Sequence, residues 1–432
     1  MFWNRKKENI SKQSTEQVVK NQQQKIKKKI PLAFLKRLIP ISNLSDSDLQ
    51  QLKITASHYQ AGDVIFNRSE FSDSLIYLVK GQCFLETSNG SGLVIDAATF
   101  NACYPLSSDT QYQVTAIAKT DVSIIHLSTT VLQQSNSNSH NPLINHKDIP
   151  KQLQQNNFFN QFCYHYQQGK LSIPPLPNVA LKLRTAMQKD IGAQEAVSIV
   201  NMDAVISAKL IQIVNSPIYR PATPITTCHD AITRLGLTTT RNLVTSISMQ
   251  NLFKSSNTKL NKRFLKLWQQ SIHISCISQT LATLMNITNP DEALLAGLVH
   301  NIGTLPIIIF ADSLDSSDYS EEDLEQTIAA IQGILGNIVL EQWGFPDALK
   351  HIPIESENWF FCSENKKELT LSDIVILAKY HSLMGSKQQN KLPPIHTLPA
   401  FQKLGDNALT ADMSLQTLHD AKQQITDAMN LF

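Results

Sequence analysis

The chain has 432 residues, of which 42% are hydrophobic, so it can bury a substantial core and is long enough for two or three domains. The net charge of +2 argues against a polyanion-binding body, and six scattered cysteines without a C-x-x-C pair argue against a disulfide framework or thiolate metal cluster. No apolar run approaches the roughly 18 residues that span a bilayer. We therefore expect a cytoplasmic protein without a membrane span.

The amino-terminal segment 1–37 contains eleven Lys or Arg and two Glu, so 11 − 2 gives a local charge of +9. Its Gln-rich, weakly apolar composition predicts a disordered tail. Two interpretations are open for its basic cluster of Lys25, Lys27, Lys28 and Lys29. The cluster either contacts nucleic acid, anionic lipid or an acidic surface, or belongs to a solvated leader.

Short β-branched and apolar runs separated by turn residues follow between 54 and 126, and they predict a small β-roll or barrel. Lys80-Gly81 fits a tight hairpin, and the residues 88–92 tolerate positive φ. Before these runs, Ser45 is placed to cap a short helix within 44–52. The expected strands are Val64–Phe66, Leu75–Val79, Gln82–Thr87, Leu93–Ile95, Val114–Ala118 and Val122–His126.

The run from Ala61 to Phe66, with Asp73, Tyr77 and Gly81 after it, resembles the first half of a cyclic-nucleotide-binding domain. That family holds the cyclic phosphate with an arginine and the ribose with a glutamate. This resemblance places Ala102 at the glutamate position and Tyr112 at the arginine position. An uncharged residue cannot form a charge-assisted pair with phosphate, so we expect a degenerate pocket kept for docking or dimerisation, or for another small ligand.

A Ser-, Asn- and Gln-rich stretch then predicts a linker at 133–165, after which apolar residues recur at helical spacing. The expected helices are those around Cys228–Leu235, Thr239–Phe253, Phe264–Met285, Pro290–Asn301, Asp323–Gln342, Pro346–His351 and Leu371–Gly385. Within 231–242, Gly236 near a turn and Arg241 beyond it also fit a helix-turn-helix that reads DNA.

The segment Ala296-Gly297-Leu298-Val299-His300-Asn301-Ile302-Gly303 resembles the A-G-L-L-H-D-I-G signature of HD-type metallophosphohydrolases, and His273 falls where that family has its first histidine. Upstream motifs resemble the HDOD domain, a helical relative found in bacterial signalling proteins, over about half the chain. These motifs are Leu171–Pro177, Asp203, Ala208–Leu210, Val214–Ser216, Tyr219, Pro224-Ile225, Ala231-Ile232, Leu235-Gly236 and Arg241–Leu243.

HD chemistry requires a divalent metal, bound by histidines and carboxylates, that activates water. The resemblance places Asn301 at the position of the metal-binding aspartate and Gln332 where a histidine is common. We therefore expect a vestigial site without metal or cofactor, in which His273 and His300 are buried imidazoles satisfied by hydrogen bonds. Weak metal binding by this pair stays open.

The expected fold is multidomain α+β. It comprises a basic tail at 1–37, a cyclic-nucleotide-binding-like β-roll with flanking helices at 38–132, a linker at 133–165, an all-α HDOD domain at 166–390 and a C-terminal extension at 391–432. The leading hypothesis is a noncatalytic signalling protein whose HDOD module contacts a protein effector. One alternative is a divergent phosphohydrolase of nucleotides or cyclic dinucleotides, with Asp291, Glu292 or Glu341 as its replacement carboxylate. The other is a nucleic-acid-associated regulator using the tail.

Overall fold

The computed structural model describes residues 30–404 apart from 89, 109–110, 131–142, 144–150, 217–218, 220, 256, 287–288, 316 and 364–367, and it also describes 422, 426 and 429. The basic residues Lys25, Lys27, Lys28 and Lys29 lie outside the described residues. The chain divides into two compact units. The first unit comprises Met1–Ser139, Glu364–Lys366 and Leu383–Leu415, and the second comprises His140–Ser363, Lys367–Ser382 and Gln416–Phe432.

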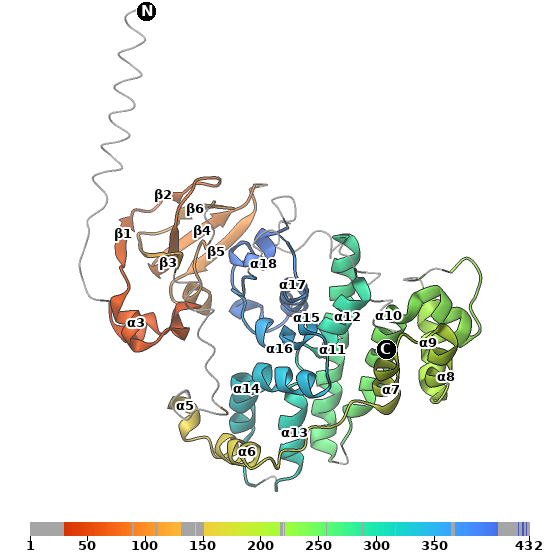
Figure 1. Ribbon diagram of the computed structural model, residues 1–432. Helices are drawn as coiled ribbons and strands as arrows, with labels where there is room; N and C mark the ends of the chain where they lie inside the picture. The colour runs from red at the N-terminus through yellow and green to blue at the C-terminus, as the bar shows by residue number, and fades with distance from the viewer. Residues whose placement is uncertain are drawn as a thin grey trace, which may run out of the picture. The chain divides into compact units, whose positions relative to one another are not determined.

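Two antiparallel sheets form the β-roll of the first unit (Figure 1). The three-stranded sheet has the order β1-β7-β3, from strands Thr55–Tyr59, Val122–Ser128 and Ser74–Lys80. The four-stranded sheet has the order β2-β6-β4-β5, from strands Val64–Phe66, Thr115–Ala118, Gln82–Glu86 and Gly92–Asp96. All the expected strands are present, and β1 joins them. The residues 88–92 connect β4 to β5, which pair from Gln82 opposite Asp96 to Glu86 opposite Gly92.

The prediction of a hairpin at Lys80-Gly81 is wrong. β3 pairs with β7, whereas β4 pairs with β5 and β6, so Gly81 carries the chain from one sheet to the other. Its φ is 86°, and a Cβ there would lie 2.4 Å from the carbonyl oxygen of Asp121. A hairpin and a change of sheet both require a residue with positive φ at this point, so the local sequence cannot distinguish them.

Short helices cover one face of the three-stranded sheet. They are α2 (Leu32–Leu35) and α3 (Asp46–Gln51), and the Ser45 side chain caps α3 as predicted, accepting a hydrogen bond from the Asp48 N–H at 3.2 Å. Tyr77 of β3 is fully buried and donates its hydroxyl proton to the Ile39 carbonyl at 3.0 Å. The core beneath the helices consists of Leu35, Leu38, Ile41, Leu44, Leu49, Leu75, Tyr77, Ile125 and Leu127.

The described part of the second unit is helical (Figure 1). Its helices include α6 (Asn157–Gln167), α7 (Asn178–Met187), α8 (Ala193–Val200), α9 (Ala204–Val214), α10 (Cys228–Met249), α11 (Thr258–Leu284), α12 (Pro290–Val299), α13 (Thr304–Asp312), α14 (Glu321–Gln342), α15 (Asp347–Lys350), α16 (Ile352–Glu355) and α17 (Leu371–Leu383). Asn289 caps α12 as predicted, accepting from the Glu292 N–H at 3.1 Å, with Pro290 at the first helical position.

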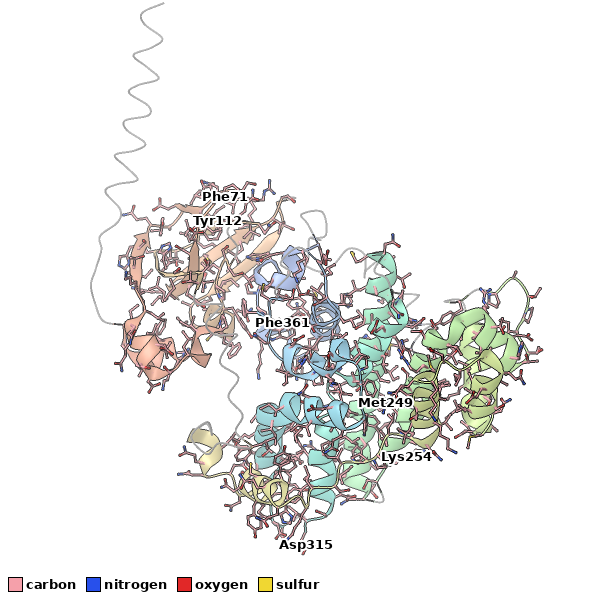
Figure 2. All side chains as sticks on the ribbon, in the orientation of Figure 1. Phe71, Tyr112, Met249, Lys254, Asp315 and Phe361 are labelled. Carbon is pink, nitrogen blue, oxygen red and sulfur yellow. The ribbon has the colours of Figure 1, made fainter. Side chains whose placement is uncertain are left out.

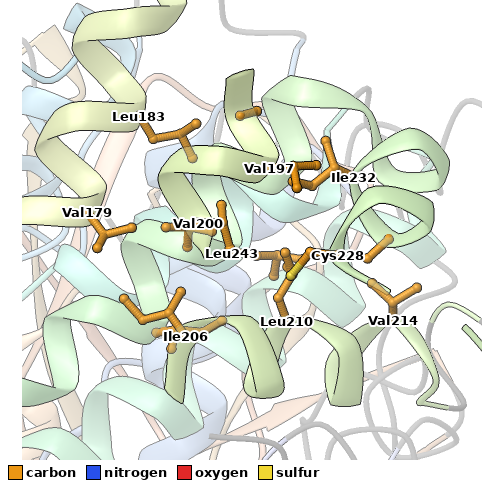
Figure 3. Close-up of a cluster of buried hydrophobic side chains, with 14 of the residues drawn as sticks. Val179, Leu183, Val197, Val200, Ile206, Leu210, Val214, Cys228, Ile232 and Leu243 are labelled. Atoms are coloured by element: carbon orange, nitrogen blue, oxygen red, sulfur yellow. The ribbon is translucent and has the colours of Figure 1, made fainter. Parts of the chain in front are cut away.

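α10 contains the break expected at Gly236, where φ is 77°. The part after the break is nevertheless a core helix, because Thr240 and every residue from Asn242 to Met249 are buried. A helix that reads DNA must present its side chains to a groove. The part of α10 from Asn242 onward therefore cannot lie in a DNA groove, and Figure 3 shows Leu243 of α10 packed among Val200, Leu210 and Cys228.

A second hydrophobic core joins α6 to α13 and α14. Phe158, Phe159 and Phe162 are fully buried, and the Phe158 ring centroid lies 5.5 Å from that of Phe310. The residues 157–165 therefore form a packed helix although the sequence indicated linker there. Polar Asn and Gln residues between these phenylalanines make the segment look like a linker in the sequence. Three buried aromatic side chains are nevertheless enough to anchor a short helix.

α12 and α13 together form a long apolar stretch. By length and composition the stretch Pro290–Asp312 could cross a membrane, with a mean hydropathy of 1.9, but 94% of its most apolar window is buried inside the protein. This burial is typical of a core helix that is hydrophobic on all sides. The sequence analysis found no apolar run of this length because it treated the two helices, which meet at Asn301 and Gly303, as separate segments.

Candidate functional site

The HD-like segment lies at the end of α12, where this helix packs closely on α11. A Cβ on Gly297 would lie 2.6 Å from the Cα of Ser275, so glycine is required for the two backbones to approach. One turn later, Ser271 of α11 donates its hydroxyl proton to the Asn301 side-chain oxygen at 2.8 Å. The oxygen at the expected aspartate position is thus engaged by a neighbouring helix.

The turn after α12 packs on α14 in the same way. A Cβ on Gly303 would lie 1.9 Å from the Gln332 carbonyl oxygen and 2.4 Å from the Gly336 nitrogen. The Gln332 side-chain oxygen accepts a hydrogen bond from Thr304 at 2.9 Å. Asn301 and Gln332, the two weakened HD positions, are therefore both held in hydrogen bonds that pin adjacent helices together.

His300 is only 4% exposed, and its Nδ1 lies 2.7 Å from the Gly297 carbonyl oxygen. A carbonyl can only accept, so Nδ1 carries the proton and donates it. Burial, followed by the nearby positive charge of Lys379, lowers the pKa of His300 to about 4, although the Gly297 hydrogen bond and Glu357 oppose this shift. His300 is therefore a neutral imidazole at pH 7.

Beside His300 the structure has an ion pair that no sequence pattern indicated. The Lys379 ammonium of α17 lies 2.6 Å from a Glu357 carboxylate oxygen and donates to the Ser356 carbonyl at 3.0 Å. The side chains of Lys379 and Glu357 are 17% and 33% exposed, so water reaches the pair in part. Desolvation acts to raise the pKa of Glu357, but the Lys379 charge and hydrogen bonds from Lys379 and Gln332 lower it overall.

These residues do not fit a divalent metal. Glu357 is the carboxylate that interacts electrostatically with His300 among the described residues, and it is already paired with the Lys379 ammonium. The neighbouring Asn301 and Gln332 are neutral amides. Within the part of the chain that the structure describes, no group of three or more His, Cys, Asp or Glu side chains is arranged to hold a metal ion. A divalent cation would also be repelled by Lys379.

His273 occupies a different side of α11. The serines at 271, 275 and 278 face α12. His273 is two positions from both Ser271 and Ser275, so its side chain lies about 200° around the helix axis from each of them. His273 is half-buried, and burial lowers its pKa. The interactions described for His300 do not include His273.

The candidate replacement carboxylates are also placed elsewhere. Asp291 accepts hydrogen bonds from Tyr219 and, at 2.9 Å, from Gln279, near the opposite end of α12 from His300. Burial and the charge of Asp291 raise the pKa of Tyr219 far above its usual range, so this phenol remains a donor. Glu341 is exposed at the end of α14.

We expect Lys379→Met to lower the free energy of unfolding by about 1–2 kcal/mol, because Glu357 loses its cation while remaining only partly hydrated. The same change should raise the pKa of His300, since the Lys379 charge helps to lower it. Urea denaturation and NMR titration of the histidines would measure both effects. The control Lys350→Met removes a more exposed pair with Asp347 and should leave stability nearly unchanged. Equal behaviour of the two variants would contradict this account.

The second candidate site is the nucleotide cassette of the β-roll. Ala102 lies in the short helix η2 (Phe100–Cys103) and is 5% exposed. The Tyr112 ring, labelled in Figure 2, packs on Phe66 with centroids 4.2 Å apart. Burial raises the pKa of Tyr112, which keeps the phenol neutral. Both positions are thus uncharged and packed into the β-roll.

Residues 391–397 of the same unit form hydrogen bonds with this cassette and the residues after it. Tyr104 donates its hydroxyl proton to the Lys391 carbonyl at 2.9 Å, and Ser108 donates to the Thr397 carbonyl at 2.6 Å. The His396 Nε2 donates to the Leu106 carbonyl at 2.8 Å. All residues from Leu392 to Leu398 are buried, and their apolar run is the sequence signal that could have indicated a packed segment in the expected extension.

Comparison with known proteins identifies the helical unit. The HDOD domain family model matches residues 173–357. A crystal structure of a candidate metal-dependent phosphohydrolase from Shewanella amazonensis is 24% identical, with a TM-score of 0.55, and the match covers 63% of this chain and 97% of that one. This likeness shows a shared fold.

Two further similarities are more limited. An uncharacterised protein of Treponema pallidum is 26% identical over 137 residues, which are 30% of this chain and 25% of that protein. The chain therefore spans about a quarter of this relative. The amino-terminal sheets are similar to a candidate cyclic nucleotide-binding protein from Geobacter metallireducens, with 20% identity and a TM-score of 0.21 over 26% of this chain and 84% of that one. Together, the family match and the helical fold show that residues 173–357 are an HDOD domain.

Proposed function

We propose that this chain is a noncatalytic regulatory protein of the cytoplasm, in which the HDOD domain contacts a protein effector and the β-roll acts as a sensor or docking unit. The observation that carries this proposal is the Lys379 ammonium bound to Glu357 beside His300. An HD enzyme requires a metal at such a place, and here a protein cation neutralises the available carboxylate.

The neighbouring hydrogen bonds support the same conclusion. Asn301 is engaged by Ser271, and Gln332 is engaged by Thr304 and Glu357, so the HD positions join helices to one another. A rigid, satisfied polar network specifies one packing of the helices. Such a module is suited to presenting a fixed surface to a partner, since a rigid surface loses little conformational entropy on association.

The β-roll supports docking in preference to cyclic-nucleotide binding. Its cassette has neutral residues at both key positions, and the carbonyl of Leu106 and hydroxyl of Ser108 are engaged by the C-terminal segment. A cyclic phosphate placed there would lack a compensating cation. These contacts within the chain cover residues that follow the cassette.

Turnover assays test the noncatalytic function. The full chain should show no hydrolysis of nucleotides, cyclic dinucleotides or bis-p-nitrophenyl phosphate with Mn²⁺, Mg²⁺ or Fe²⁺ above the level of a chelator-treated control. The matched variant is His300→Ala, which removes the remaining imidazole of the site. Metal-dependent turnover that disappears in this variant would overturn the proposal, whereas turnover that persists would indicate a contaminant.

A further inference from the structure

A pocket in the second unit lies apart from the His300 region, between α7, α10, α12 and the start of α15. Its enclosed space is about 30 Å³, and the rest of the roughly 320 Å³ around it is open to solvent. The polar part of its lining comprises Arg184, Arg241, Asn242 and Thr245, and the apolar walls include Leu176 and Phe345. Two guanidinium groups in one small hollow concentrate positive charge there.

Arg184 reaches the pocket from α7 and lacks partners for part of its guanidinium. Its Nε and Nη1 atoms are buried without a hydrogen-bond partner, and the described ion pairs do not include it. Burial, and after it the like charge of Arg241, lowers the pKa of Arg184. Gly344, at φ 67°, makes room for this side chain, because a Cβ there would lie 3.1 Å from Arg184 Nη2.

Arg241 and Asn242 supply a third unsatisfied donor. The Nε and Nη2 atoms of Arg241 both donate to the Asn242 side-chain oxygen at 3.3 Å. This orientation of the amide is required, because the flipped form would set its NH₂ against guanidinium N–H groups. The Nδ2 of Asn242, a residue only 1% exposed, is then left buried without a partner while its side chain lines the pocket.

This arrangement is unfavourable in the protein alone. Each buried donor without a partner loses its hydrogen bonds to water, and the two guanidinium groups repel each other. An oxyanion in the pocket would neutralise both charges and would give an acceptor to the guanidinium N–H groups that face it. Arginine binds phosphate through paired N–H donors, and a phosphate dianion matches the two positive charges better than a single carboxylate does.

We propose that the pocket lined by Arg184, Arg241 and Asn242 binds the phosphate group of a small phosphorylated molecule. Binding here requires no turnover and would persist if the His300 region were found to be catalytic. The proposal gives a role to two sequence segments that the HD-like site leaves unused, namely 171–177 and 241–243.

Thermal denaturation of the full chain tests the proposal. Inorganic phosphate should raise the melting temperature above that in sodium chloride or acetate of equal ionic strength, because a ligand of the native state stabilises it by mass action. Titration calorimetry with inorganic phosphate, AMP, GMP and a cyclic dinucleotide would then separate a free ion from a nucleotide as the source of the phosphate. Tighter binding of one organic phosphate would identify the ligand class.

The matched variants are Arg184→Met, which keeps an unbranched apolar side chain, and Lys182→Met, on the exposed side of the same helix. Arg184→Met should raise the melting temperature without ligand and weaken phosphate binding about tenfold or more, the effect of losing a charged bidentate contact. Lys182→Met should retain wild-type binding. The proposal is overturned if phosphate gives no increase beyond acetate, if both variants respond equally, or if Arg184→Met is less stable than wild type without ligand.

Discussion

Gly303→Ala should lower the free energy of unfolding by about 3 kcal/mol or prevent folding, because the added methyl group would overlap the α14 backbone. A Cβ at Gly303 would lie 1.9 Å from the Gln332 carbonyl oxygen and 2.4 Å from the Gly336 nitrogen. Neither atom belongs to a side chain that could rotate away. The last glycine of the A-G-L-V-H-N-I-G segment is thus required for helix packing, independently of any chemistry at His300.

The control for this change is Gly192→Ala. Gly192 precedes α8, its φ of −83° suits any residue, and a Cβ there meets nothing within 4 Å. Alanine at Gly192 meets no steric clash, so it should cost only the preference of an N-cap for glycine, up to about 1 kcal/mol. Urea denaturation followed by circular dichroism would compare the two variants, and similar losses of stability would show that α13 and α14 are not packed as described.

Acidification from pH 7 to pH 5 should destabilise each unit by about 2 kcal/mol, through one buried histidine in each. Burial lowers the pKa of His300 and of His396 to about 4, from an ordinary value of 6.5. The unfolded chain therefore binds protons at pH 5 that the folded chain excludes. The stabilisation is complete well above pH 6.5 and decreases as the pH falls toward 4.

Melting temperatures measured between pH 7 and pH 5 would detect this loss before most carboxylates titrate. His396→Gln should flatten the pH dependence of the first unit, since glutamine retains a donor for the Leu106 carbonyl but does not gain a proton. His229→Gln is the control, because the His229 side chain is 54% exposed. An unchanged pH profile in His396→Gln would show that His396 titrates normally.

The sequence indicated the elements of this fold better than their connections. Alternating and helical apolar spacing predicted the strands and most helices, and the caps at Ser45 and Asn289 are as expected. The change of sheet at Gly81 was missed because the local sequence predicts that the chain turns there but not which strand pairs with which. The same limit applies to Lys379 of α17, which lies 22 residues from Glu357 in the turn after α16.

The candidate site was predictable only where residues are adjacent in the chain. The segment containing His300 and Asn301 was identified from its motif, whereas the side of α11 that faces α12 depends on backbone packing at Gly297 and Ser275. That packing places Ser271 opposite Asn301 and turns His273 away. A pair of arginines 57 positions apart, such as Arg184 and Arg241, carries no sequence signal at all.

The buried run from Leu392 to Leu398 also constrains the order in which the protein folds. The β-roll is translated first, yet its cassette bonds to residues that leave the ribosome only after the whole HDOD domain. The β-roll therefore completes these native contacts only after the HDOD domain has been translated. Until then the cassette surface stays uncovered, and it is available to chaperones throughout the translation of some 260 intervening residues at about 5–20 residues per second.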